Sequence, residues 1–369
     1  MIVPMIDLHA QYQDIKKEID AAITQILEET SFIGGPEVRQ FEEDFKTVVG
    51  AGHVISCANG TDSMEMTLKA LNISAGDEVI VPAHTWISTS EVVVTAGAVP
   101  VFADVAFDSC CISIEDIKKK ITTKTKAIIA VHLYGHPADL DALVQLSEEH
   151  NLHLIEDCAQ AHGSTYKGQP VGSFGTASSF SFYPGKNLGC YGDGGAVFTK
   201  DEQLALKIRQ LGNHGQLTKH DHRIHGRNSR LDTLQARVLS VKIPYLKGWI
   251  EKKNEHAAYY HEGLKGIKEI DLPTLMGENR YHSWHLYVLK TKKRDALKAY
   301  LQEQDIQCGI HYPKALPFQP CYSDFDHKKT DFPVAARLQD EVLSLPMYAE
   351  LEKEQLDHVI SSITTFFER

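Results

Sequence analysis

A lysine in a glycine-rich loop is the residue of this sequence that most readily predicts chemistry. Lys186 follows Pro184 and Gly185 and precedes a glycine-rich turn at residues 192–195. A lysine on such tight backbone is expected to face a cavity, where a lowered pKa would let its amine form a Schiff base. The alternative is a solvated loop lysine, the commoner case. The neighbouring glycines do not form the G-x-G-x-x-G pattern of a dinucleotide site.

The start of a predicted helix could bind a phosphate group. Residues 59–62 read Asn-Gly-Thr-Asp and precede a helix-like stretch with an apolar face. A Gly60-Thr61 turn at a helix N-terminus exposes backbone N–H groups, and the helix dipole adds positive potential there. Asp62 is expected to cap the helix, with Glu65 as its capping-box partner. The alternative is a well-capped helix that binds nothing.

A carboxylate is expected at the end of a buried strand. Residues 152–157 read as an apolar strand that ends at Asp157. Burial of this carboxylate is costly unless a positive group meets it, and a protonated pyridine nitrogen would be such a group. The alternative is that Asp157 caps the helix that follows.

Several histidines raise the question of a metal site. They are His214, His220, His222, His225, His282 and His285. No cysteine or carboxylate at ligand spacing completes the group from His214 to His225, and Lys219 and Arg223 lie within it. We therefore expect no metal.

The elements that must position these residues are typical of an α/β fold. Apolar, β-branched runs predict strands at residues 78–81, 99–104, 127–132 and 152–157. Helix-like stretches such as 138–150 lie between them, which indicates a buried, mostly parallel sheet. Later runs at 178–183 and 196–199 follow each other too closely for helical crossovers, so the sheet is expected to be mixed. Ligands of such sheets bind at the carboxyl ends of the strands.

The pattern changes after about residue 247. A helix is expected at 248–264, a strand at 285–289 and a helix at 294–304. We predict a large domain over residues 1–248 and a smaller α+β domain over 249–369.

Composition limits the classes of partner and the location. The 369 residues carry 38 Lys and Arg against 49 Asp and Glu, so the net charge is 38 − 49 = −11. An acidic chain has no general attraction for nucleic acid. No apolar run approaches the ~18 residues of a membrane span, and the N-terminus does not resemble a signal peptide. The seven cysteines show no CxxC spacing, so we expect reduced thiols and a cytoplasmic location.

The helix start, the strand-end carboxylate and the loop lysine together indicate a function more specifically than any one of them does. A Gly-Thr helix start, a strand-end Asp-x-x-Gln and a later loop lysine are typical of pyridoxal-phosphate (PLP) enzymes of fold type I, the aspartate-aminotransferase fold. The sequence resembles the DegT/DnrJ-type nucleotide-sugar aminotransferases over nearly its whole length. The segments that carry the resemblance are 33–38, 59–62, 77–86, 155–163, 181–195, 228–236, 311–313 and 343–347.

The resemblance implies a role for each matched residue. Lys186 would hold PLP covalently and act as the catalytic base, Asp157 would pair with the pyridine nitrogen, and Gln160 would bind the ring's 3′ oxygen. Trp86 would stack on the ring, although a core tryptophan is the alternative. The implied phosphate ligands are Gly60, Thr61, the Asp62 backbone, Ser181 and, from the neighbouring subunit of a homodimer, Asn228.

The resemblance also implies the substrates. L-glutamate would donate the amino group, and a nucleotide-diphospho-keto-sugar would accept it. Tyr183, His311 and Tyr312 would line the sugar-nucleotide side, and Arg230 and Lys219 are candidates for the diphosphate. Gly185 stands where relatives often have a hydroxyl residue, which puts in doubt one contact that would bind the phosphate or position the lysine.

The motifs favour one position on the sugar. Ser-Phe-Tyr-Pro-x-Lys-Asn-Leu-Gly, Gly-Asp-Gly-Gly and Asn-Ser-Arg-Leu-Asp resemble the branch that acts on 3-keto sugars, so we predict amination at C3. The substrate could be a dTDP-3-keto-6-deoxyhexose, a UDP-3-keto-N-acetylglucosamine or its uronic acid. The alternatives are a 4-keto-sugar aminotransferase, a PLP-dependent sugar dehydratase, which would carry histidine in place of Lys186, and a PLP-fold regulator.

Overall fold

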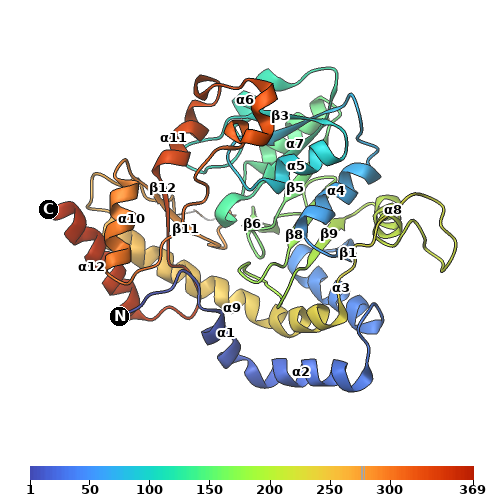
Figure 1. Cartoon of the computed structure of the whole chain (residues 1–369), viewed down its shortest axis with the longest axis horizontal. Coiled ribbons are helices and arrows are strands. Elements are labelled where there is room, and N and C mark those ends of the chain that lie inside the picture. Colours follow the sequence, from blue (N-terminus) through green and yellow to red (C-terminus); the bar gives the residue numbers. More distant parts are fainter. Residues whose placement is uncertain (276, 278) are drawn as a thin grey trace.

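A seven-stranded sheet forms the centre of the computed structural model, which describes every residue except 276 and 278 (Figure 1). In spatial order the strands are β1 (His53–Cys57), β9 (Gly195–Thr199), β8 (Ala177–Ser181), β5 (His153–Asp157), β4 (Thr125–Val131), β2 (Glu78–Pro82) and β3 (Val99–Ala103). The five strands from β8 to β3 are parallel, whereas β9 runs antiparallel to both β8 and β1. The predicted mixed, mostly parallel sheet is confirmed.

Both faces of the sheet are buried, as the continuous apolar strands predict. Alternate residues of one strand enter different cores: Ile128 of β4 packs in one core, and its neighbour Ile129 packs in the other. The first core is closed by helices α3 (Pro36–Val49), α6 (Ile114–Lys120), α7 (Leu140–Glu149) and α9 (Thr233–Leu264). The second is closed by α4 (Gly60–Ala70), α5 (Ser88–Thr95) and α11 (Pro333–Glu341).

The C-terminal part adds a second, smaller sheet. Strand β11 (Tyr287–Lys290) pairs antiparallel with β12 (Val342–Leu345). Helices α10 (Arg294–Glu303) and α12 (Lys353–Glu368) share an apolar core with the end of α9, at the left of Figure 1. Val3, near the N-terminus, forms a bridge with Ile306 and is buried in the same core.

Helix α9 is longer than the sequence predicts. It begins at Thr233 instead of residue 248 and contains Pro244, because burial of residues such as Leu239 and Leu246 outweighs the helix-breaking tendency of proline. The helix is continuous through residues 248 and 249, so the predicted boundary would fall inside one helix. The division into two domains stays a prediction.

The remaining elements are short or peripheral. They are α1 (Leu8–Asp14), α2 (Lys16–Glu29), α8 (Glu202–Gly212), β6 (Thr165–Tyr166), β7 (Gln169–Pro170), β10 (Arg280–Tyr281), η1 (Leu133–Gly135), η2 (Leu316–Phe318), η3 (Pro320–Phe325) and η4 (Lys329–Asp331). None of the helices in the described part of the chain is long and apolar enough to cross a membrane. All seven cysteines are free thiols in this structure.

Candidate active site

A cavity of about 540 Å³ opens at the carboxyl ends of the central strands. Val131, Asp157 and Ser181, the last residues of β4, β5 and β8, all line it. The site therefore lies where parallel sheets usually bind ligands. Ten of the predicted site residues line this cavity: Gly60, Thr61, Trp86, Asp157, Gln160, Ser181, Tyr183, Lys186, His311 and Tyr312.

Lys186 lies on a compact turn inside the cavity. Its backbone N–H donates to the carbonyl of Tyr183 (2.8 Å), and Cys190 N–H closes the turn on the carbonyl of Phe182 (2.8 Å). Burial lowers the pKa of the Lys186 amine to about 8, although the Asp157 carboxylate acts in the opposite direction. A much larger fraction of this amine is therefore uncharged near neutral pH than is usual for lysine, as a nucleophile or base requires.

Asp157 is a buried carboxylate with no cationic side chain within 4 Å among the described residues. It is 5% exposed and accepts hydrogen bonds from Thr89 Oγ1 (3.0 Å) and Ala159 N–H (3.1 Å). Burial raises its pKa, and these hydrogen bonds only partly oppose the rise. The carboxylate thus lies at the cavity wall with an unmet preference for a positive partner.

The first turn of α4 faces the cavity with unpaired donors. The first N–H groups of a helix have no intrahelical acceptor, and Gly60 and Thr61 supply these groups here. A Cβ on Gly60 would lie 2.8 Å from the Cβ of Ser181, so only glycine allows this close approach. The Thr61 and Ser88 hydroxyls are 2.8 Å apart and lie beside the turn.

The expected cap of α4 is wrong. Asn59 is the N-cap, and its side chain accepts the N–H of Asp62 (2.8 Å), because the helix begins at Gly60, three residues earlier than an Asp62 cap requires. The carboxylates of Asp62 and Glu65 instead pair with Arg227, at 3.0 and 2.8 Å. Asp62 does not line the cavity, and its N–H is already engaged.

A hydrogen-bonded chain fixes the amide of Gln160. Its Oε1 accepts the N–H of Tyr134 (2.7 Å), so its Nε2 is the donor that points to Tyr312 Oη (3.0 Å). The ring of Tyr312 lies 5.6 Å from that of Trp86, which is 56% exposed. Gln160 and Trp86 thus both line the cavity beside Tyr312, and Trp86 is not a core residue.

Neutral histidines surround Lys186. His311 Nδ1 bonds to Ser344 Oγ (2.8 Å), and burial followed by the Lys186 charge lowers its pKa to about 4. Burial, then Lys186, also lowers the pKa of His285 and of His162, the latter to about 3. His285 lines the cavity, although the sequence led us to consider it only as a metal ligand.

Other cavity residues escaped the sequence analysis. They are Met5, Ile6, Met64, Thr85, Ser88, Val131, Ala159, Asp193, Leu286 and Met347. Thr85 and Ser88 flank Trp86, so a wider reading of that segment could have found them. Met5 carries no local signal, whereas Met347 lies in segment 343–347, which carries the family resemblance but was given no role.

Asn228 and Arg230 lie outside this cavity. Both are exposed, in the segment between α8 and α9, where Asn228 forms a bridge with Asn213 at the end of α8. Arg227 and Ser229 fix the segment to the helix α4 region, since Ser229 Oγ also accepts the N–H of Ala58 (3.2 Å). Asn228 and Arg230 therefore do not line the cavity of their own chain.

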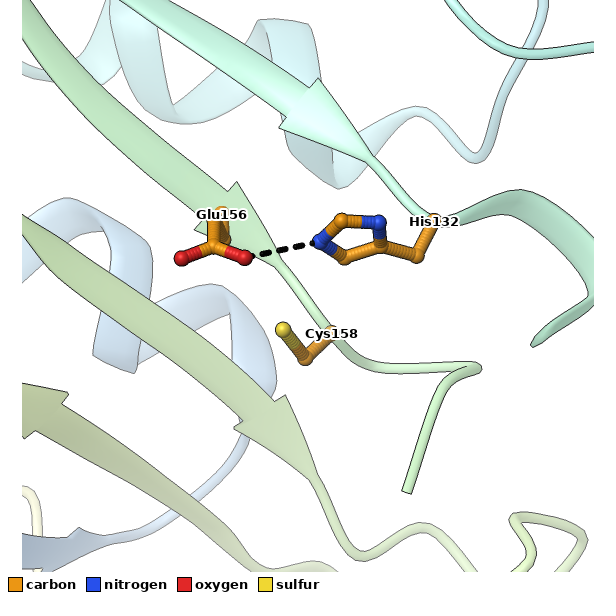
Figure 2. A group of neighbouring side chains, drawn as sticks. All are labelled: His132, Glu156 and Cys158. Atoms are coloured by element: carbon orange, nitrogen blue, oxygen red, sulfur yellow. Dashed lines mark hydrogen bonds and ion pairs between the residues drawn. The ribbon is translucent and has the colours of Figure 1, made fainter. Parts of the chain in front are cut away.

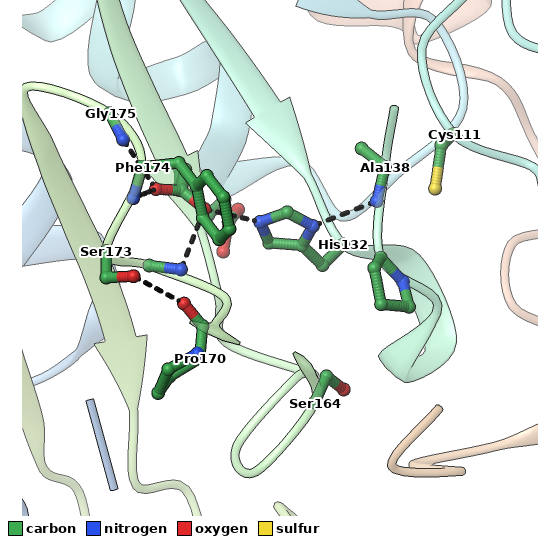
Figure 3. A network of polar contacts seen from close by, with 12 residues as sticks. Cys111, His132, Ala138, Ser164, Pro170, Ser173, Phe174 and Gly175 are labelled. Atoms are coloured by element: carbon green, nitrogen blue, oxygen red, sulfur yellow. Dashed lines mark hydrogen bonds and ion pairs between the residues drawn. The ribbon is translucent and has the colours of Figure 1, made fainter. Parts of the chain in front are cut away.

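A second polar cluster lies behind Asp157, formed by His132, Glu156 and Cys158 (Figure 2). It is the one group in the described residues whose ligand atoms are close enough together to hold a metal. However, His132 Nδ1 accepts the N–H of Ala138 (3.0 Å), so Nε2 carries the proton donated to Glu156 (3.0 Å) (Figure 3). A protonated Nε2 cannot ligate a metal.

The Glu156 carboxylate is fully satisfied by donors. Besides His132, it accepts the N–H groups of Gly172 (2.7 Å), Phe174 (2.8 Å) and Gly175 (2.7 Å). Burial opposes its ionisation, but the bonds from His132 and the backbone outweigh burial and lower its pKa. Glu156 therefore ties the loop before β8 to β5, which carries Asp157.

The residues present fit PLP. The cavity combines an amine of lowered pKa, an unpaired buried carboxylate for a protonated ring nitrogen, and helix N–H donors for a phosphate. These groups match three parts of the cofactor: the carbon that reacts with an amine, the ring nitrogen and the phosphate.

Comparison with known proteins identifies relatives over the full length. Residues 13–364 match the DegT/DnrJ/EryC1/StrS aminotransferase family. A dTDP-3-amino-3,4,6-trideoxy-alpha-D-glucose transaminase from Streptomyces venezuelae is 40% identical (100% of this chain, 97% of the relative). A UDP-N-acetyl-3-dehydro-alpha-D-glucosamine 3-aminotransferase from Acidithiobacillus ferrooxidans is 42% identical (98% and 97%). A protein named pleiotropic regulatory protein, from Geobacillus stearothermophilus, is 41% identical (100% and 99%).

Solved structures show the same fold. DesV from S. venezuelae superposes with a TM-score of 0.97 at 40% identity, covering 100% of this chain and 99% of DesV. NtdA from Bacillus subtilis, solved with bound pyridoxamine phosphate (PMP), gives a TM-score of 0.94 at 30% identity and covers 100% and 86%. The predicted fold type I architecture is confirmed.

Proposed function

The chain belongs to the DegT/DnrJ/EryC1/StrS aminotransferase family, and we propose that it transfers the amino group of L-glutamate to C3 of a nucleotide-linked 3-keto sugar. It is a PLP-dependent sugar aminotransferase. The observation that carries the proposal is the convergence of Lys186, Asp157 and the first turn of α4 on one cavity. The free thiols support a cytoplasmic location.

Lys186 has two tasks in this reaction. Its amine holds the cofactor and, once released, takes a proton from the Cα of glutamate and later returns one to C3 of the sugar. Bound PLP supplies an electron sink that stabilises negative charge at these carbons. The lowered pKa supports the assignment, because an amine that titrates at about 8 can exchange protons in either direction near neutral pH.

The surrounding side chains orient the ring. Asp157 would keep the ring nitrogen protonated and so maintain the electron sink, and Gln160 Nε2, which points to Tyr312 Oη in this structure, would donate to the 3′ oxygen. Trp86 covers one face. The N–H groups of Gly60 and Thr61, with the Ser181 hydroxyl, hold the phosphate.

The sugar nucleotide requires cations that the cavity of one chain lacks. Lys186 is the only lysine or arginine among the described residues that line it. We therefore assign Asn228 to the PLP phosphate, and Arg230 and Lys219 to the substrate diphosphate, of the neighbouring subunit in a homodimer. Tyr183, His311 and Tyr312 contact the sugar and position its ketone.

Two relatives support C3 as the position of amination, since one is a 3-amino-sugar transaminase and the other a 3-aminotransferase by name. Their substrates carry dTDP and UDP respectively. The nucleotide and the oxidation state of C6 therefore have to be determined by assay.

Absorption spectroscopy of the purified protein tests the function first. We expect a visible band from lysine-bound PLP that disappears when glutamate is added, with formation of 2-oxoglutarate. A panel of 3-keto and 4-keto sugar nucleotides then tests the position, and only the 3-keto compounds should restore the band. Release of a deoxysugar without consumption of glutamate would indicate a dehydratase. A band that responds to no substrate would favour the regulatory role suggested by one relative's name.

A further inference from the structure

Tyr134 is a buried residue that contacts the wall of the cavity without lining it. It is 5% exposed and lies in η1, which follows β4. Its N–H donates to Gln160 Oε1 (2.7 Å), its carbonyl accepts the N–H of Leu286 (3.2 Å), and its hydroxyl donates to the carbonyl of His311. These three partners all line the cavity. Tyr134 therefore joins parts of the cavity wall that are far apart in the sequence.

The hydroxyl of Tyr134 completes a closed ring of hydrogen bonds. Gln160 accepts the Tyr134 N–H at Oε1 and donates from Nε2 to Tyr312 Oη (3.0 Å). Tyr312 follows His311 in the chain, and the His311 carbonyl accepts the Tyr134 hydroxyl. The ring connects Gln160, which we assign to the 3′ oxygen of the cofactor, with the two residues that we assign to the sugar.

The hydrogen bonds of the Tyr134 hydroxyl have defined directions. The carbonyl of His311 can only accept, so the hydroxyl donates its one proton there and accepts from His84 Nε2 (3.2 Å). Burial lowers the pKa of His84 to about 4, so this ring is neutral and its one proton lies on Nε2. Loss of the hydroxyl would leave both the His311 carbonyl and the His84 N–H without this partner.

The same ring of bonds leaves the Tyr312 hydroxyl with a proton to donate. Its oxygen accepts from Gln160, and no group among the described residues accepts its proton. Burial raises the pKa of Tyr312, so the hydroxyl is protonated at neutral pH. Because Tyr312 lines the cavity, this proton is available to an oxygen of the sugar. The Gln160 amide has a second N–H, which remains for the 3′ oxygen.

The backbone of Tyr134 is strained. Its φ is 62° and its ψ is 3°, in the left-handed region where a Cβ crowds the backbone. Bulky residues seldom adopt this conformation, and it persists where surrounding contacts determine it, often at functional sites. The bonds from the N–H, the carbonyl and the hydroxyl are contacts of this kind, and all three lead to the cavity wall.

We propose that Tyr134 is a positioning residue for the sugar nucleotide: its hydroxyl holds His311 and Tyr312 in place for the sugar, while its N–H separately fixes Gln160 for the cofactor. The inference rests on the proposed function. It predicts that removal of the hydroxyl alone impairs the sugar step and spares the glutamate step, because the backbone N–H remains.

The two half-reactions of Tyr134→Phe test the inference. The glutamate step is followed as loss of the visible PLP band, and its rate constant and half-saturating glutamate concentration should stay within about twofold of the unaltered protein. The sugar step is followed as return of the band on addition of UDP-3-keto-N-acetylglucosamine or a dTDP-3-keto-6-deoxyhexose. Its half-saturating concentration should rise about tenfold, because the lost hydrogen bonds no longer hold residues 311 and 312.

Trypsin cleavage after Lys314 provides a second measurement, which requires no turnover. Lys314 is exposed and lies two residues beyond Tyr312. Brief digestion of the full chain with PLP, quantified by mass spectrometry, should show cleavage there at least about fivefold faster in Tyr134→Phe. Tyr166→Phe is the matched control, because Tyr166 is 4% exposed, its hydroxyl donates to Asp139 Oδ1 (3.2 Å), and neither residue lines the cavity. This control should change neither measurement.

Thermal unfolding shows whether each variant folds. An unchanged half-saturating concentration of the sugar nucleotide in folded Tyr134→Phe would overturn the inference, and so would unchanged cleavage after Lys314. Equal losses in both half-reactions, or a variant that does not fold, would also overturn it, because the hydroxyl would then serve the whole cavity or the whole fold. These results leave the aminotransferase function standing. If neither sugar nucleotide restores the band in the unaltered protein, the proposed function fails and the inference fails with it.

Discussion

Asp157 illustrates how a functional residue can oppose the stability of the chain that carries it. Its buried carboxylate has hydrogen bonds but no cation within 4 Å among the described residues, and burial raises its pKa. We predict that Asp157→Asn stabilises the cofactor-free protein by about 1–3 kcal/mol. The same change should slow turnover by about 10²-fold or more, because the ring nitrogen loses its charged partner.

The pH dependence of this effect has a definite sign. The pKa of Asp157 is higher in the folded than in the unfolded chain, so the destabilisation exists above the folded pKa and disappears below the unfolded value near 3.8. Urea unfolding should show that the free energies of unfolding of Asp157→Asn and the unaltered protein differ most at neutral pH and do not differ in acid. A difference in the free energy of unfolding that is constant with pH, or a variant less stable than the unaltered protein, would contradict this account.

Glu156, the preceding residue, should behave in the opposite way. Its carboxylate accepts four hydrogen bonds, and after the opposing effect of burial the bond from His132 and the backbone N–H groups lower its pKa. An amide at this position would direct its own N–H groups at donors. We therefore predict that Glu156→Gln destabilises the protein by about 2–4 kcal/mol at neutral pH.

The sign for Glu156 follows from its lowered folded pKa. Its contribution to stability exists above the unfolded value near 4.5 and is lost as the pH falls through the folded value. Chemical unfolding over a pH series should show the Glu156→Gln deficit shrinking in acid. Equal stability of the two proteins at pH 7 would show that the network does not hold this loop.

At the scale of an element, the first turn of α4 depends on the absence of a side chain at Gly60. A Cβ there would meet Ser181 Cβ at 2.8 Å and push the helix start away from β8. We predict that Gly60→Ala weakens PLP binding at least about tenfold, measured by titration of the cofactor-free protein. Unchanged affinity would remove this turn from the phosphate site.

Gly248→Ala provides the matched control for that change. Gly248 lies within α9, and a Cβ there would have no described atom from outside its own helix backbone within 4 Å. Alanine is the better helix former, so this variant should gain up to about 1 kcal/mol of stability without a change in PLP affinity. Comparison of the two separates the steric effect at the site from a general effect of replacing glycine.

How far the sequence predicted these elements depended on whether the signal was local. The strands ending at Val131 and Asp157 were predicted because β-branched runs mark buried parallel strands. The sequence does not predict the start of α9, because the packing that keeps this helix continuous past Pro244 involves distant residues. The Asn59 cap and the cavity positions of Met5 and Met347 likewise depend on three-dimensional contacts.

At the scale of the whole molecule, one chain has only part of the proposed site. The cavity has Lys186 as its single lysine or arginine among the described residues, although its proposed substrate carries a diphosphate. Meanwhile Asn228 and Arg230 are exposed and do not line the cavity of their own chain. A homodimer in which each chain supplies these residues to its partner would account for both observations.

Complementation between two defective chains tests this arrangement directly. Lys186→Ala should abolish activity, and Asn228→Ala should lose activity at limiting PLP. If Asn228 acts on the partner's site, a mixed dimer contains one site with both residues intact, since Lys186 comes from one chain and Asn228 from the other. Random reassortment makes half of the dimers mixed, so activity should return to about a quarter of the unaltered level. If Asn228 serves its own chain, every site in the mixture lacks one residue, and the mixture stays as inactive as its components.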